Sequence, residues 1–153
     1  MPEPAPARQL DILLAEDNEF DAHVTVAAFR DAIVPNRVHC VADGEAVMAF
    51  LQRTGEHSDA PRPDLIVLDL NLPKIDGFQV LEAIKTDPNL KNIPVVVVSG
   101  NDGEGVIKRA YELQASAFVV KPQEVDEYFA AIRSLKQLWF HAASVASKTD
   151  SPE

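Results

Sequence analysis

The sequence contains almost no cysteine, and Cys40 is its single thiol. One cysteine cannot form an intramolecular disulfide, which excludes the disulfide-stapled secreted class and is typical of a protein of the reducing cytoplasm. We therefore expect a cytoplasmic location. Because Cys40 stands between His39 and Val41 in a short strand-like segment, we expect it to be a small core residue rather than a nucleophile.

Long apolar runs and positive charge are also lacking. No stretch is long enough to span a bilayer, and the N-terminus has neither the basic patch nor the apolar core of a secretory signal. The formal net charge is -10, from 14 Lys and Arg against 24 Asp and Glu. Nucleic-acid phosphates would repel such a chain, and no cluster of Lys and Arg offsets this. We therefore expect neither a membrane nor a nucleic acid as partner.

Apolar strands and amphipathic helices, by contrast, alternate five times along the chain. The 153 residues fit one domain, which we place at 10–140 between a loose N-terminal tail at 1–9 and a polar C-terminal tail at 141–153. The strands are continuous apolar runs, so both faces of the sheet are covered, which is typical of a parallel sheet with helices on both sides. The predicted strands are 10–16, 37–42, 64–69, 94–99 and 116–120. A helix follows each strand, the last from about 123 to 140.

The first of these helices has its apolar residues spaced for one buried face. The residues assigned to that face are Phe20, Val24, Ala27, Ala28 and Phe29. Either Asp17 or Asn18 can cap its N-terminus.

Charged residues stand at the ends of three predicted strands. Glu16 and Asp17 end the first strand, Asp69 ends the third, and Lys121 follows the fifth. Because ligands bind beyond the C-terminal strand ends of such sheets, we expect these side chains to meet. Mg²⁺ prefers oxygen ligands. The sequence therefore predicts Mg²⁺ beside a carboxylate that can carry a phosphoryl group, with Asp17 and Asp69 as direct ligands and Glu16 acting through water.

Further residues complete this predicted site. The backbone carbonyl of Asn71 would be another metal ligand. Lys121 would act as a point charge, pairing with Asp69 at rest and with phosphoryl oxygens after transfer. Ser99, at the end of the fourth strand, would offer its hydroxyl to the same oxygens, although it could instead cap the next helix. Asp69 would be the nucleophile and form an aspartyl-phosphate.

Together these segments resemble the receiver domain of two-component response regulators over roughly residues 10–140. The matching segments are Leu14-Ala15-Glu16-Asp17-Asn18, Asp69-Leu70-Asn71-Leu72-Pro73-Lys74-Ile75-Asp76-Gly77, Ser99 and Phe118-Val119-Val120-Lys121-Pro122. The resemblance implies a flavodoxin-like (βα)5 three-layer α/β sandwich with strand order 2-1-3-4-5, Mg²⁺ dependence, and a phosphoryl group taken from a histidine kinase. It also implies a switch in which the hydroxyl of Ser99 moves to the phosphoryl group and Phe118 turns inward behind it.

Finer features are similar to the stand-alone regulators paired with bacterial phytochrome kinases. They include the loop 53–63, Thr86-Asp87-Pro88 and the late Leu138-Trp139-Phe140. This similarity implies a light-regulated kinase as donor and a homodimer through the face of the fourth and fifth helices. Trp139 and Phe140 then either cap the core or form an exposed dimer seam.

Several functions compete at this stage. The first is a non-enzymatic phosphoacceptor without an output domain, which dephosphorylates only itself and acts by binding a protein, by dimerising, or as a phosphate sink or phosphorelay shuttle. A haloacid-dehalogenase-type phosphatase also uses a strand-end aspartate, but needs a second aspartate where Asn71 stands. The intact acid set opposes a receiver that works without phosphorylation. A nucleotide or flavin binder would need a glycine-rich loop after the first strand.

Overall fold

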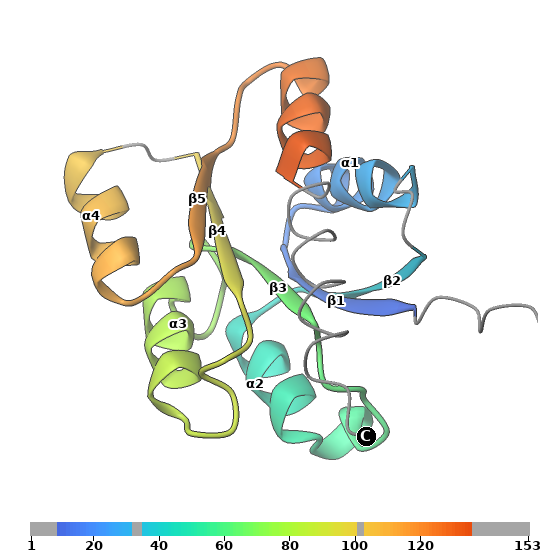
Figure 1. The fold of residues 1–153 in the computed structure, drawn as a ribbon, viewed down its shortest axis with the longest axis vertical. Coiled ribbons are helices and arrows are strands. Elements are labelled where there is room, and N and C mark those ends of the chain that lie inside the picture. The colour runs from blue at the N-terminus through green and yellow to red at the C-terminus, as the bar shows by residue number, and fades with distance from the viewer. Residues whose placement is uncertain (1–8, 32–34, 101–102, 136–153) are drawn as a thin grey trace, which may run out of the picture.

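The computed structural model describes residues 9–31, 35–100 and 103–135, which form a central sheet between two layers of helices (Figure 1). The sheet is parallel, with strand order β2-β1-β3-β4-β5. Its strands are β1 (Leu10–Ala15), β2 (Asn36–Val41), β3 (Leu65–Asp69), β4 (Val95–Ser99) and β5 (Ala117–Val120). The predicted fold class and strand order are thus confirmed.

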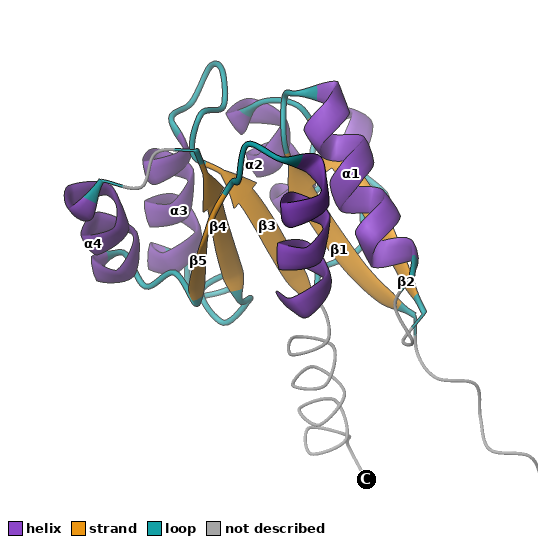
Figure 2. Ribbon diagram, turned by 90° about the horizontal axis from the view of Figure 1, so that it is seen from above, coloured by secondary structure: helices purple, strands orange, loops and turns teal. Residues whose placement is uncertain are grey.

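The helices divide between the two faces of this sheet (Figure 2). One face packs against α1 (Glu19–Arg30) and helical residues 125–135. The other packs against α2 (Gly44–Gln52), α3 (Gly77–Thr86) and α4 (Glu104–Glu112). The loop predicted at 53–63 contains one short 3-10 helix, Gly55–His57. No helix in the described ranges is long and apolar enough to cross a membrane.

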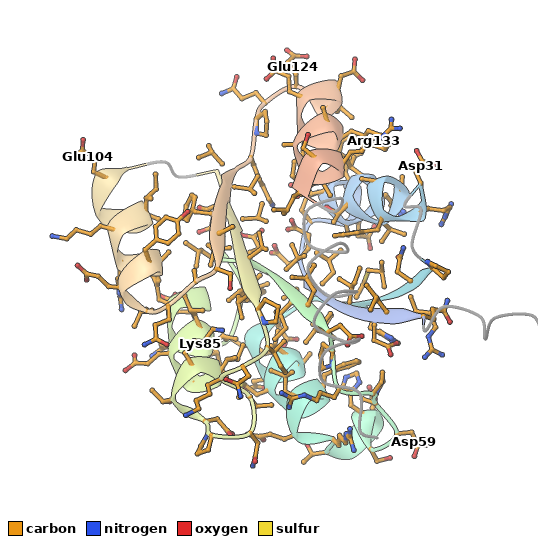
Figure 3. All side chains as sticks on the ribbon, in the orientation of Figure 1. Asp31, Asp59, Lys85, Glu104, Glu124 and Arg133 are labelled. Atoms are coloured by element: carbon orange, nitrogen blue, oxygen red, sulfur yellow. The ribbon has the colours of Figure 1, made fainter. Side chains whose placement is uncertain are left out.

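The strand residues alternate between two separate cores, and β1 shows this most simply. Ile12 and Leu14 pack with α1, whereas Leu13 and Ala15 pack with α2 and α3. Every residue of β1, β3 and β4 is buried, which explains why these strands read as unbroken apolar runs. Acidic side chains such as Glu104 and Glu124 lie at the outside of the molecule, while carbon fills the space between sheet and helices (Figure 3).

Side-chain caps start α1, α2 and α3. Asn18 accepts a hydrogen bond from the backbone N–H of Asp21 and caps α1, and Asp43 caps α2. Asp76 and Gln79 form a reciprocal capping box at α3. These caps fix the loops at the C-terminal edge of the sheet, where the charged residues lie.

Two residues expected in the core are exposed instead. Phe20 is 60% exposed, and the buried face of α1 consists of Val24, Thr25, Ala28 and Phe29. Helical spacing correctly predicted which side of α1 faces the sheet. It could not show that the first turn of α1, which contains Phe20, extends past the edge of the core. Cys40 is exposed because β2 is an edge strand that is covered unevenly.

The ends of the chain fall outside the described residues. This applies to most of the predicted N-terminal tail and to the C-terminal tail at 141–153. It also applies to residues 136–140 of the predicted last helix, including Trp139 and Phe140. The predicted dimer seam therefore stays a prediction.

Candidate functional site

The strand register brings the predicted site residues to one edge of the sheet. Asp69 pairs with Val98 in β4, and Ser99 pairs with Val120 in β5. Lys121 follows Val120 directly, and its backbone N–H donates to the Ser99 carbonyl oxygen at 2.8 Å. Because parallel strands end in the same direction, residues far apart in the chain meet here.

Lys121 is the centre of the site's ion pairs. Its Nζ lies 2.8 Å from Asp69 Oδ2, 2.5 Å from Glu16 Oε1 and 3.0 Å from Asp21 Oδ2. Only 15% of the Lys121 side chain is exposed to solvent. The contact between Lys121 and Asp69 was expected from the sequence, whereas the contact with Asp21 was missed. Asp21 lies in the first turn of α1, where an acidic residue is common, so nothing in its spacing pointed to Lys121.

The loop after β3 holds Asp69 from the other side. Asp69 Oδ1 accepts a hydrogen bond from the backbone N–H of Asn71 at 2.9 Å. The loop then returns to the strand end at Gly77, whose N–H donates to the Leu70 carbonyl oxygen at 3.3 Å. A Cβ atom at Gly77 would lie 2.5 Å from Leu70 Cα and 2.9 Å from Asp69 O. Only glycine allows α3 to begin this close to Asp69.

Burial and the ion pairs shift the protonation equilibria of the site in different directions. Burial raises the pKa of Glu16, and a hydrogen bond with Asp69 raises it further. Burial alone would raise the pKa of Asp69, but hydrogen bonds with Glu16, Lys121 and the Asn71 backbone outweigh it and lower the pKa. Burial would likewise lower the pKa of Lys121, but hydrogen bonds to Asp69 and Glu16 raise it instead. Asp69 is therefore an anion beside a fixed cation.

Three carboxylates of the site fit a hard divalent cation. Glu16, Asp17 and Asp69 each offer an oxygen, and these oxygens lie within 4.8 Å of one another. Glu16 and Asp69 are buried, and Asp17 is exposed and could be reached from solvent. An all-oxygen donor set suits Mg²⁺ better than a softer metal. A cation here would also relieve the repulsion between the carboxylates.

The remaining predicted residues lie around this centre. Ser99 is almost fully buried at the end of β4. Phe118, in β5, is partly buried and packs against the core that contains α2, α3 and α4. The switching roles of Ser99 and Phe118 stay predictions, as does the metal contact of the Asn71 carbonyl.

The sequence is similar to signalling proteins over nearly its whole length. A family model described as the response regulator receiver domain matches residues 12–133. The response regulator Rcp1 of Synechocystis sp. (strain ATCC 27184 / PCC 6803 / Kazusa) is 37% identical over 134 residues, which cover 88% of this chain and 91% of Rcp1.

Solved structures give the same result for the fold. The phosphorylated cyanobacterial phytochrome response regulator RcpA matches with a TM-score of 0.85 and 40% identity, covering 88% of this chain and 96% of RcpA. The Mn²⁺-bound form of Rcp1 matches with a TM-score of 0.82 and 38% identity, covering 85% of this chain and 94% of the other.

Proposed function

This chain belongs to the response regulator receiver domain family, and we propose that it accepts a phosphoryl group from a sensor histidine kinase onto Asp69. The observation that carries this proposal is the pairing of Asp69 with Lys121 at 2.8 Å, beside the carboxylates of Glu16 and Asp17. A strand-end anion with a fixed cation and a candidate metal site is what phosphoryl transfer requires, because its barrier is lowered mainly by positioning and charge neutralisation.

The transfer replaces one bond to phosphorus by another. A bond forms between an Asp69 carboxylate oxygen and phosphorus, while the phosphorus–nitrogen bond of the kinase's phosphohistidine breaks. The imidazole leaves with the bonding electrons and takes up a proton from water. Lys121 faces the negative charge on the phosphoryl oxygens, and the Asn71 N–H holds the Asp69 carboxylate in place.

Mg²⁺ would be held by Asp17, Asp69 and the Asn71 carbonyl, with Glu16 acting through water. Bound there, it would neutralise charge on the phosphoryl oxygens. The similarity to Rcp1, a response regulator with a Mn²⁺-bound form, supports a divalent cation at this site. The oxygen donors of this chain fit that assignment.

A phytochrome-type sensor kinase is the proposed donor. The similarity to RcpA, whose structure is that of a phosphorylated phytochrome response regulator, supports this choice. Phosphorylation would be read by Ser99 and Phe118 and would change the surface that binds a downstream protein. We expect a cytoplasmic, non-enzymatic signalling protein that forms a homodimer, with Trp139 and Phe140 at the seam.

Phosphate uptake is tested with a small-molecule donor. Incubation with acetyl phosphate and Mg²⁺ should add the mass of one phosphoryl group to the intact protein. The gain should vanish in Asp69→Ala and persist in Asp59→Asn, since Asp59 is an exposed acid outside the site (Figure 3). No gain in the unaltered protein would contradict the proposal.

The choice of kinase and the dimer need separate measurements. Radiolabelled phosphate should pass from an autophosphorylated phytochrome histidine kinase to Asp69 faster than from a kinase with another sensor. Light scattering of Trp139→Ala and Phe140→Ala should show a smaller mass than that of the unaltered protein. An unchanged mass would remove the dimer seam.

A further inference from the structure

Lys121 has a third carboxylate partner to which the proposed chemistry gives no role. Asp21 Oδ2 lies 3.0 Å from Lys121 Nζ, and the Asp21 side chain is 26% exposed, against 5% for Asp69 and 2% for Glu16. An ammonium group has three N–H donors, and these three carboxylates can take all of them. Lys121 is thereby tied at once to β3, to the end of β1 and to α1.

Asp21 is itself fixed by the first turn of α1. Its backbone N–H donates to Asn18 Oδ1 at 3.0 Å, and its carbonyl oxygen accepts from Thr25 Oγ1 at 2.9 Å. Thr25 is fully buried. The backbone of Asp21 is therefore fixed on α1, and its short side chain starts from a fixed point. A lysine side chain is long and loses much rotamer freedom when it is held.

We propose that Asp21 is a positioning residue that holds the Lys121 ammonium for phosphoryl transfer to Asp69. The proposal rests on the phosphoacceptor function argued above. When Asp69 carries the phosphoryl group, the N–H that now points to Asp69 Oδ2 must turn to a phosphoryl oxygen. The bonds to Asp21 and Glu16 keep the ammonium within reach during that change.

Asp21 acts on the lysine rather than on the metal. It lies outside the group of carboxylates that meet closely enough for a cation within the described ranges, which consists of Glu16, Asp17 and Asp69. Loss of Asp21 should therefore lower the rate of transfer and leave the affinity for Mg²⁺ unchanged. Loss of Asp17 should weaken the affinity for Mg²⁺.

The kinetic test compares Asp21→Asn with Glu19→Gln. Both residues are acids in the first turn of α1, where negative charge favours the helix N-terminus. Glu19 is exposed to solvent, whereas Asp21 is ion-paired with Lys121. At saturating Mg²⁺, Asp21→Asn should slow phosphorylation by acetyl phosphate about tenfold, which corresponds to about 1.4 kcal/mol. Glu19→Gln should react at the rate of the unaltered protein, and Asp21→Glu should recover part of the rate.

A second readout follows the lysine directly and needs no phosphate. The ammonium protons of Lys121 should give a sharp ¹H–¹⁵N signal in the unaltered protein and in Glu19→Gln, because carboxylates hold them away from water. The signal should broaden in Asp21→Asn. If the unaltered protein takes up no phosphate, the phosphoacceptor function fails while this signal still decides the contact.

Three outcomes would overturn the positioning role of Asp21. They are an unchanged Lys121 signal in Asp21→Asn, an unchanged rate in that variant at saturating Mg²⁺, and a rate loss that extra Mg²⁺ restores. The last would assign Asp21 to the metal instead.

Discussion

Lys121 Nζ lies 2.8 Å from Asp69 Oδ2, although the two residues belong to strand ends that are not neighbours in the sheet. β4 lies between β3 and β5, so the lysine side chain reaches across the end of a strand to its partner. The ion pair therefore links the last strand to the centre of the sheet, and we expect both phosphoryl transfer and the stability of the fold to depend on it.

Replacement of Lys121 by Met should prevent phosphorylation and also destabilise the protein. The variant leaves the buried carboxylates of Glu16 and Asp69 together without a cation, and breaking such a buried pair costs about 3 kcal/mol. Urea unfolding without Mg²⁺ measures the loss. Mg²⁺ should restore part of the stability but not the phosphorylation.

The control for this change is Lys74→Met. Lys74 is 55% exposed, and its carboxylate partners lie 3.6 and 3.7 Å away, so its removal should change the free energy of unfolding by less than about 0.5 kcal/mol. If Lys74→Met and Lys121→Met lower the free energy of unfolding equally, the buried pair of Lys121 with Asp69 contributes no more to stability than an exposed ion pair.

Mg²⁺ should stabilise the folded protein through the carboxylates of Glu16, Asp17 and Asp69. Once its concentration exceeds the dissociation constant, each tenfold increase should add about 1.4 kcal/mol to the free energy of unfolding. Denaturant unfolding at constant ionic strength measures this dependence. Asp17→Asn should flatten it.

Asp31→Asn provides the matched control for charge alone. Asp31 is exposed beyond the other end of α1 (Figure 3), so its loss should leave the Mg²⁺ dependence as it is in the unaltered protein. A dependence that Asp17→Asn and Asp31→Asn share would place the cation elsewhere.

Gly77→Ala should reduce both stability and phosphorylation. Its Cβ would lie 2.5 Å from Leu70 Cα and 2.9 Å from Asp69 O. These are backbone atoms that cannot turn aside, so we expect a cost of about 1–3 kcal/mol. The strain should also displace the loop after Asp69 and slow phosphate uptake at temperatures where the variant is still folded.

Gly105→Ala should have the opposite effect and raise the stability of the protein. Gly105 lies in α4 with nothing within 4 Å of the added Cβ, so alanine should stabilise the helix by about 0.5–1 kcal/mol. Thermal unfolding of the two variants side by side measures the contrast. A Gly77→Ala protein as stable as Gly105→Ala would mean that the backbone at Leu70 can move away.

The pattern of apolar runs and helices was sufficient to predict a covered parallel sheet and the meeting of Glu16, Asp17, Asp69 and Lys121, whereas the strand order 2-1-3-4-5 was implied by the resemblance to receiver domains. Continuous apolar runs require a covered parallel sheet, and such a sheet brings its strand ends to one edge. These two general rules are enough to predict that charged residues far apart in the sequence meet at one edge of the sheet.

The sequence did not predict the exposure of Phe20 and Cys40 or the contact between Asp21 and Lys121, because these features depend on tertiary packing. The spacing of apolar residues in α1 does not show that Phe20 lies outside the core. The sequence of β2 likewise does not show that this is an edge strand from which Cys40 faces solvent. Asp21 reads as a common acidic residue at a helix start. Its contact with Lys121 depends on where the lysine side chain ends, which strand and helix periodicities do not determine.

Alkaline pH should weaken the packing of helical residues 125–135 on α1 through Tyr128. Its hydroxyl lies 3.2 Å from Thr25 Oγ1, and both side chains are buried. Because the Thr25 hydroxyl donates to the Asp21 carbonyl oxygen, Tyr128 is the donor in this pair. Burial raises the pKa of Tyr128 to about 12 from 10.0.

The sign of the effect follows from that shift. Below pH 10 the tyrosine is protonated in both folded and unfolded chains, so its full contribution to stability is present. As the pH rises from 10 through 12, the unfolded chain loses this proton first, and the free energy of unfolding should fall by roughly 2–3 kcal/mol. Tyr128→Phe, which has no proton to lose, should show a smaller fall over the same range. Urea unfolding of both proteins between pH 9 and 12, followed with tyrosinate absorbance, measures the difference, and parallel curves would show that Tyr128 ionises as freely in the folded protein as in the unfolded chain.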